Sequence, residues 1–198
     1  MPNWCFNKLT VSHDSAEQID RFDKAYREDW TIETFYPTPR DPNDPTKLLG
    51  EDEGALDGKM PDWWSWRIAN WGTKWDIGCK ATNGTSYGTE PTRVGNELSM
   101  CFDSAWSPPI GFYERLKTLG FTVEASYFEP GMVFAGTWHD GEDDYYEGDL
   151  SEFPKDLVDL YQMQEYYNDE QVAYRDNFLV DLWRVFLLNN VSPLLTTT

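Results

Sequence analysis

The order in which strand-like and helix-like patterns follow one another constrains the fold of this chain most strongly. Residues 4–11 alternate between two faces, as a half-buried strand does, and residues 15–27 then carry apolar residues at helical spacing. Further strands are predicted where alternation returns, at residues 30–34, 75–81, 98–102, 121–127 and from 132 onward. Two more helices are predicted, at residues 61–68 and 109–119. This order predicts an α+β fold with an antiparallel or mixed sheet and helices on one face, as in ferredoxin-like folds.

Two stretches interrupt these patterns, and a third extends beyond them. Residues 37–60 contain four prolines among Asp, Asn and Gly, which predicts an inserted loop, and residues 83–95 predict a long hairpin connection. Residues 139–198 predict an acidic hairpin that turns at Asp140-Gly141, and then helices with apolar residues at 157–161 and 174–186. The expected organisation is one domain over residues 1–138, with an acidic extension over 139–198 packed on it.

The composition is typical of a folded protein from a reducing compartment. Hydrophobic residues make up 40% of the chain and aromatic residues 16%, which is enough for a core despite the high charge. Cys5, Cys79 and Cys101 are odd in number and show no Cys-x-x-Cys spacing, so we expect reduced thiols in the core. The sequence has no recognisable secretory signal and no stretch as long as a membrane span, which predicts a cytoplasmic protein without membrane contact.

Four short pieces of the sequence carry a family resemblance. They are NWCFNKLTV at residues 3–11, NWGTKWD at 70–76, AWSPPI at 105–110 and YFEPGMVFAG at 127–136. Together they resemble the YubB ferredoxin-like family of phages, plasmids and genomic islands, which is functionally uncharacterised. The resemblance covers about residues 1–138. It implies a ferredoxin-like sheet and a mobile genetic element as the source, and it implies no activity.

Negative charge is concentrated after the part that carries this resemblance. The chain has 16 Lys and Arg against 35 Asp and Glu, which gives a formal charge of −19. Residues 139–181 hold fourteen acids against one lysine and one arginine, which is −12 of that total. Tyrosines are interleaved with these acids. The residues predicted to contact a partner are Glu142, Asp143, Asp144, Tyr145, Tyr146, Glu147, Asp149, Asp156 and Asp159.

Such a surface favours a basic protein as partner and disfavours nucleic acid. It repels polyanions and steers basic surfaces towards it, and dense carboxylates can imitate the phosphates of DNA. Tyrosines among the acids would anchor the interface. We therefore expect a mobile-element accessory protein that binds and inhibits a basic, nucleic-acid-handling host defence protein, of the anti-CRISPR or anti-restriction type. The alternative is a solvated surface whose charge serves only solubility.

A cluster of tryptophans indicates a second possible function. Five of them lie between Trp63 and Trp75, and rings at this density can stack a base, a sugar or a cation. This alternative is a small-ligand or nucleotide-binding module, and its expected pocket residues are Trp66, Trp71, Trp75, Trp106 and Phe128. The same rings can instead form the core, and both interpretations stay open. Binding of single-stranded nucleic acid on the sheet is disfavoured, because the basic residues are few and dispersed.

The sequence contains no motif for catalysis, for a metal or for a cofactor, so we expect a non-enzymatic protein with neither. Among the many acids, Asp103 and Glu129 lie in or next to the family-like pieces. Glu129 precedes Pro130-Gly131 at a predicted hairpin, where a carboxylate is expected to accept backbone N–H groups rather than to transfer protons. His13 and His139 are expected to be surface residues at strand ends.

Overall fold

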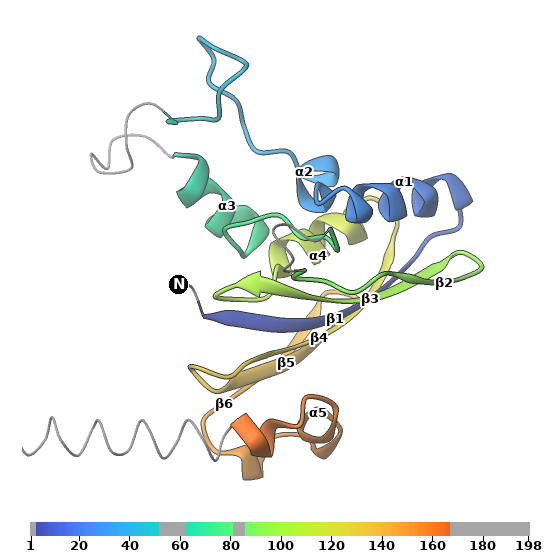
Figure 1. Ribbon diagram of the computed structural model, residues 1–198, viewed down its shortest axis with the longest axis vertical. Coiled ribbons are helices and arrows are strands. Elements are labelled where there is room, and N and C mark those ends of the chain that lie inside the picture. Colours follow the sequence, from blue (N-terminus) through green and yellow to red (C-terminus); the bar gives the residue numbers. More distant parts are fainter. Residues whose placement is uncertain (1–2, 52–61, 81–85, 167–198) are drawn as a thin grey trace, which may run out of the picture.

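A computed structural model describes residues 3–51, 62–80 and 86–166 of the chain (Figure 1). Its centre is a six-stranded sheet in the order β2-β3-β1-β4-β5-β6, in which neighbouring strands are antiparallel. The strands are β1 (Trp4–Ser12), β2 (Thr92–Val94), β3 (Glu97–Ala105), β4 (Thr122–Glu129), β5 (Phe134–His139) and β6 (Glu142–Glu147). The predicted α+β class, with an antiparallel sheet, is confirmed.

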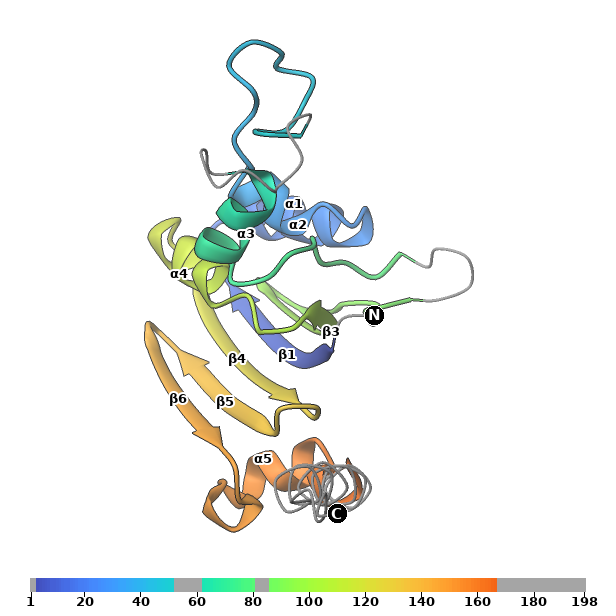
Figure 2. The same cartoon turned by 90° about the vertical axis from the view of Figure 1, so that its left-hand side faces the viewer.

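The helices divide between the two faces of the sheet. Helices α1 to α4 lie on one face, and α5 lies on the other (Figure 2). Their bounds are α1 (Ala16–Arg27), α2 (Thr31–Phe35), α3 (Trp63–Trp71), α4 (Ile110–Thr118) and, after the 3₁₀ turn η1 (Leu150–Glu152), α5 (Lys155–Leu160). Helix α3 is fixed at both ends, because the Asp62 carboxylate accepts the Ser65 N–H and Gly72 leaves the helix with a φ of 86°.

The main core lies between the sheet and helices α1 to α4. The strands alternate, so that every second side chain faces these helices, which is the period that the sequence shows. The fully buried members include Leu9, Val11, Leu98, Val123, Ile19, Phe22, Tyr26, Trp71, Phe112 and Leu116. Full burial of one such side chain stabilises the fold by about 1.5–3 kcal/mol.

A second core lies on the other face of the sheet. Phe128 of β4 and Ala135 of β5 pack there against four residues of the segment that contains η1 and α5, namely Leu150, Phe153, Leu157 and Met163. The α5 layer covers the β4–β6 side of this face, whereas Lys8 of β1 and Cys101 of β3 are exposed. The sheet therefore has an open area beside α5, and this area positions one of the grooves described below.

Two predicted strands are wrong. Residues 30–34 were expected to form a strand, but residues 31–34 belong to α2 and Trp30 precedes it, because Asp76, which is distant in sequence, caps that helix. Residues 75–80 form no strand, because their backbone bonds to helices rather than to the sheet: the Thr31 hydroxyl donates to the Ile77 carbonyl, and the Cys79 N–H donates to the Tyr26 carbonyl. The alternation there does identify side chains that face the core, since Ile77 and Cys79 are buried.

Other boundaries differ from prediction by less. Helix α3 runs to Trp71 rather than ending near residue 68. The expected connection over residues 83–95 contains β2, and Gly88 bridges to Phe102 of β3. The Asp140-Gly141 turn is confirmed, with φ values of 48° and 95° between β5 and β6. Of the predicted helical tail, α5 is confirmed, and residues 174–186 lie outside the described residues, as do residues 52–60 of the expected loop.

No helix in the three described segments is long and apolar enough to cross a membrane. The expected boundary near residue 138 falls at the end of β5, and β6 pairs with β5 along its whole length. The first part of the acidic extension is therefore a strand of the same sheet.

Candidate functional site

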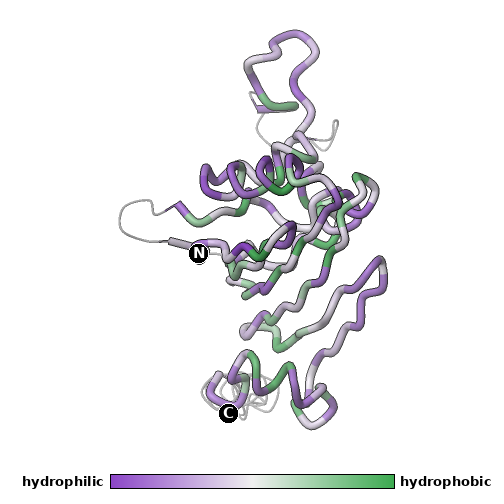
Figure 3. Tube along the Cα trace, turned by 90° about the vertical axis from the view of Figure 1, so that its right-hand side faces the viewer, coloured by the Kyte–Doolittle hydropathy of each residue, from purple (hydrophilic) through white to green (hydrophobic). Residues whose placement is uncertain are grey.

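Strand β6 carries most of the residues predicted to contact a partner. It is the last strand of the sheet, paired with β5 along one edge and with no strand along the other within the described part of the chain. Five of its six residues are exposed, and Tyr146 is half-buried. Figure 3 shows this outer strand as mostly hydrophilic. We call residues 142–147 the acidic edge.

The acidic edge presents different groups on its two sides. Asp143, Tyr145 and Glu147 lie on the side of helices α1 to α4, opposite Trp138, Gly136 and Phe134 of β5. The Tyr127 hydroxyl donates to Asp143 Oδ1 at 2.7 Å, so Asp143 has a role in holding β6 to β4. The Tyr145 hydroxyl donates to Glu147 Oε2 at 2.8 Å. Burial, and then this bond, raise the pKa of Tyr145 to about 12. Burial also raises the pKa of Tyr127, so both tyrosines remain neutral donors.

A groove of about 390 Å³ lies beside the acidic edge on this same side. It separates the start of α4, with Pro108 and Ile110, from Tyr127, Phe134 and Tyr145. The groove thus combines an apolar lining with the carboxylate of Asp143 at its rim.

The opposite side of the acidic edge continues onto α5. Tyr146 packs on Phe153 with a ring distance of 6.1 Å and anchors β6 to the second core. Asp149 caps η1 by accepting the Ser151 N–H, whereas Asp156 and Asp159 are exposed on α5. Residues 139–166 hold ten carboxylates and one basic residue, a lysine, a formal charge of −9. The predicted contact residues therefore share one region, but Asp143, Tyr146 and Asp149 also have structural roles.

The residues of the alternative tryptophan pocket do not come together. Trp71 is fully buried in the main core, and Trp66 packs against that core. Phe128 is buried in the second core, on the other face of the sheet. Trp75 and Trp106 lie at the surface, 39% and 38% exposed. The interpretation as core is right for Trp71, and the pocket as predicted is not formed, because its residues belong to three different environments.

Trp75 and Trp106 are instead part of a cluster of surface rings. Lys74 Nζ lies 5.1 Å from the ring centroid of Trp75 and 5.5 Å from that of Trp106, which is cation–π geometry. Trp75 also contacts Trp4 at 5.7 Å, and Trp4 stacks on Tyr87 at 4.5 Å. This cluster leads to the open area of the sheet.

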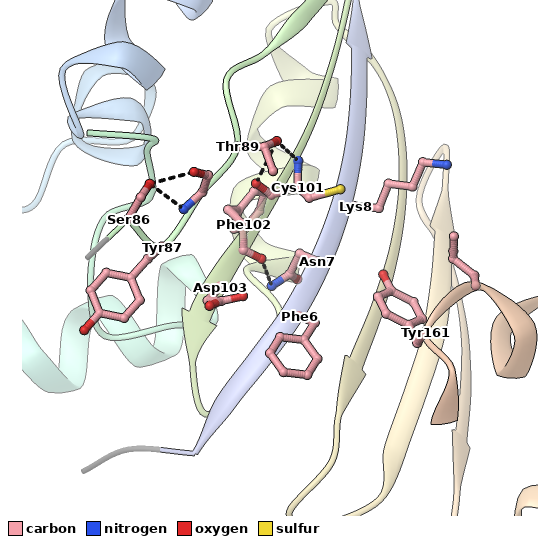
Figure 4. A pocket seen from close by; sticks show the side chains of 12 residues that line it. Phe6, Asn7, Lys8, Ser86, Tyr87, Thr89, Cys101, Phe102, Asp103 and Tyr161 are labelled. Carbon is pink, nitrogen blue, oxygen red and sulfur yellow. Dashed lines mark hydrogen bonds between the residues drawn. The ribbon is translucent and has the colours of Figure 1, made fainter. Parts of the chain in front are cut away.

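A second groove of about 390 Å³ lies on that open area, and sequence reasoning did not find it (Figure 4). Its floor comes from β1 and β3, with Phe6, Lys8, Cys101 and Asp103, and its walls come from residues 86–89 and from Leu160 and Tyr161. We call it the open-face groove. Its residues come from four segments of the chain, so no sequence spacing could have revealed it.

Asp103 is the distinctive polar group of the open-face groove. It pairs with Phe6 across the strands, and its backbone N–H donates to the Tyr87 carbonyl at 2.7 Å. Figure 4 shows its side chain between the rings of Phe6 and Tyr87. Burial raises the pKa of Asp103 to about 6. The carboxylate is therefore ionised at neutral pH in spite of partial desolvation.

The remaining residues considered from sequence have structural positions. Glu129 is buried and accepts the N–H groups of Gly131 and Met132, as expected for that hairpin. His13 Nδ1 accepts the Ser15 N–H before α1, and His139 lies 3.7 Å from Glu124 at the surface. Cys5, Cys79 and Cys101 are free thiols, and Cys5 and Cys79 are buried as predicted. The prediction of a core position is wrong for Cys101, which is exposed because its side chain points to the open face of the sheet.

Comparisons of the chain with family models, with curated proteins and with solved structures find no match. Function is therefore inferred from the charges, rings and grooves of the molecule itself.

Proposed function

We propose that this protein is a non-enzymatic binding protein whose acidic edge and α5 dock onto a basic, nucleic-acid-handling host protein and block it. The observation that carries the proposal is the charge of residues 139–166, ten carboxylates against a single lysine, on an exposed strand and an adjoining helix. Carboxylates at this density compete for a surface that has evolved to bind phosphates. Tyr145, which is 50% exposed, supplies an aromatic anchor among them.

The proposed partner is a host defence complex that acts on nucleic acid, and the proposed setting is a mobile genetic element acting in the host cytoplasm. The family resemblance of residues 1–138 motivates the setting, and the three free cysteines suit a reducing compartment. Charged residues on an edge strand also prevent pairing between copies of a protein. Replacing acids of the edge with Lys keeps the strand charged, so it preserves this protective role and removes only the negative charge proposed to bind the partner.

The finer fold assignment is part of the same proposal. In chain order β1, α1, β2, β3, α4 and β4 form two β-α-β units, and their strands lie in the order β2-β3-β1-β4. This is the arrangement expected of a ferredoxin-like unit. Helices α2 and α3 would then be an insertion, and β5, β6 and α5 an extension. Contacts between backbone protons measured by NMR that pair the strands in a different order would refute this assignment.

The functional proposal is tested by reversing acids that have no structural role. Glu142, Asp144 and Asp159 are exposed and lie on the acidic edge and α5. Changing all three to Lys should weaken capture of a basic host protein from lysate by about tenfold or more, and should lower the association rate first. Exposed reversals of this kind alter stability by about 0.5 kcal/mol each or less, so the fold should persist, as circular dichroism would verify.

The matched control reverses three exposed acids elsewhere. Asp14, Glu28 and Glu114 lie near or on α1 and α4, and the same substitutions change the net charge equally. Capture of the same purified basic protein should be nearly unchanged. Equal loss in both variants would mean that only net charge matters, and binding retained by the first variant would remove the acidic edge as the site.

A further inference from the structure

The open-face groove contains a carboxylate without a cationic partner. Within the described part of the chain, the Asp103 side chain forms no hydrogen bond and no ion pair, and burial is the cause of its raised pKa. Lys8 lines the same groove but points away from Asp103 (Figure 4). A half-buried carboxylate without a compensating charge is costly in the free protein, and an incoming cation would remove that cost.

The rings around Asp103 specify the shape of the cation. Phe6 lies opposite Asp103 in the sheet, and Tyr87 is joined to it through the backbone. Tyr87 is 45% exposed, although its ring stacks on Trp4. A planar, weakly hydrated guanidinium can stack on such rings and give two N–H groups to one carboxylate, whereas an ammonium is compact and strongly hydrated.

At another site the chain combines a carboxylate and aromatic rings with a guanidinium that is already bound. The Arg67 guanidinium lies 4.2 Å from the ring centroid of Trp71 and 5.2 Å from that of Trp63. It also forms an ion pair with Glu33 at 3.3 Å and donates to the Thr38 hydroxyl. In the open-face groove the carboxylate and the rings are present, and the guanidinium is not supplied by any described residue.

We propose that the open-face groove binds a guanidinium group, and that its occupant is an arginine side chain of the basic partner. Asp103 accepts its N–H groups, and Phe6 and Tyr87 hold its plane. The groove volume of about 390 Å³ lies at the lower end of the range of ligand pockets, which suits one side chain rather than a large cofactor. The choice of a protein arginine rests on the proposed function, whereas recognition of the guanidinium does not.

The test uses the full chain and N-acetyl-argininamide, followed by NMR through the backbone signals of Tyr87 and Asp103. We expect a saturable shift of these signals. N-acetyl-citrullinamide, which has the same shape without charge, and N-acetyl-lysinamide should bind about tenfold more weakly or not at all. Equal binding of the three compounds, or no shift with the arginine compound, would refute the proposal.

Two variants locate the site. Asp103→Asn should weaken arginine binding by about tenfold or more, and Asp14→Asn at an exposed position just before α1, which removes the same charge, should leave it unchanged. Equal losses in the two variants would overturn the assignment to Asp103. If Asp103→Asn fails to fold, the comparison of arginine with citrulline on the wild-type protein decides alone.

The pH dependence gives an independent reading on the wild-type protein. Below a pKa of about 6 the Asp103 carboxyl is protonated, so arginine binding should weaken as the pH falls from 7 to 5. The other titratable groups that line the groove are Lys8, Tyr87, Cys101 and Tyr161, none of which is a carboxylic acid or a histidine. Constant binding across this range would contradict the role of Asp103.

Failure of this test is distinguishable from failure of the proposed function. If the arginine compound does not bind while reversal of Glu142, Asp144 and Asp159 still abolishes partner capture, the groove is wrong and the acidic edge stands. If the compound binds and the reversals have no effect on partner capture, the groove stands and the acidic edge is wrong.

Discussion

Trp106 follows β3 with a φ of 69°, a conformation that costs a bulky residue about 1–2 kcal/mol. Its N–H donates to the Asn3 carbonyl at 2.9 Å, and its ring packs against Trp64 at 6.5 Å. These contacts hold the strained residue in place at the edge of the surface ring cluster. The strain is a property of this position that the side-chain pattern of the sequence does not contain.

Replacing Trp106 with Gly and with Ala separates backbone strain from the loss of the ring. Both variants lose the same ring contacts, but only Gly adopts a positive φ without penalty, so we expect Trp106→Gly to be more stable than Trp106→Ala by about 1 kcal/mol. Urea denaturation measures the difference. Trp75 is similarly exposed and is not among the residues with positive φ, so the same pair of substitutions there should show the opposite order. The same order at both positions would argue against strain at Trp106.

Helix α2 depends on Asp76, which is distant in sequence. The Asp76 carboxylate accepts the N–H groups of Ile32 at 2.7 Å, Glu33 at 2.9 Å and Ile77 at 2.8 Å. Asp76→Ala leaves three N–H groups without this acceptor and should lower the free energy of unfolding by about 3 kcal/mol. Asp76→Asn keeps one oxygen acceptor and should cost less. Chemical denaturation of the two variants measures both values, and a stable Ala variant would show that water replaces the carboxylate without loss.

The difference in stability between the wild type and Asp76→Asn should also depend on pH. Burial raises the folded-state pKa of Asp76 to about 6, above the value of about 3.8 for the unfolded chain. The folded state therefore takes up this proton first as the pH falls. Relative to Asp76→Asn, the wild type should gain stability between pH 7 and pH 4. A wild type that loses stability relative to Asn over this range would mean that the three N–H bonds outweigh burial.

The same helix shows what the sequence could and could not predict. Alternation over residues 4–11, 98–102 and 121–127 predicted strands correctly, because one side of each strand faces a core. Over residues 30–34 the same alternation was misread, since a five-residue helix with an external cap leaves the same apolar pattern. The acidic edge was predictable because its charges are consecutive in sequence. The open-face groove was not, because Phe6, Tyr87, Asp103 and Tyr161 meet only through the sheet and α5.

At the scale of the whole molecule, two cores hold one sheet while the net charge of −19 opposes compaction. The repulsion is strongest around residues 139–166, which carry −9 and contribute β6 and α5 to the second core. Salt screens exposed charges, since the Debye length falls from about 30 Å at 0.01 M to about 10 Å at 0.1 M. The same screening should therefore strengthen the fold and weaken a charge-led contact with a partner.

We expect the melting temperature to rise by a few degrees between 10 and 100 mM NaCl, as measured by scanning calorimetry without a partner. Reversal of Glu142, Asp144 and Asp159 to Lys changes the net charge by two for each residue, from −19 to −13, and relieves the repulsion where it is concentrated. Its melting temperature should therefore depend less on salt than that of the wild type. Reversal of Asp14, Glu28 and Glu114 reaches the same net charge but leaves residues 139–166 unchanged, so its salt dependence should remain closer to the wild type. Equal salt dependence in both variants would show that the repulsion acts over the whole surface, and a melting temperature that falls with salt would show that the surface ion pairs outweigh it.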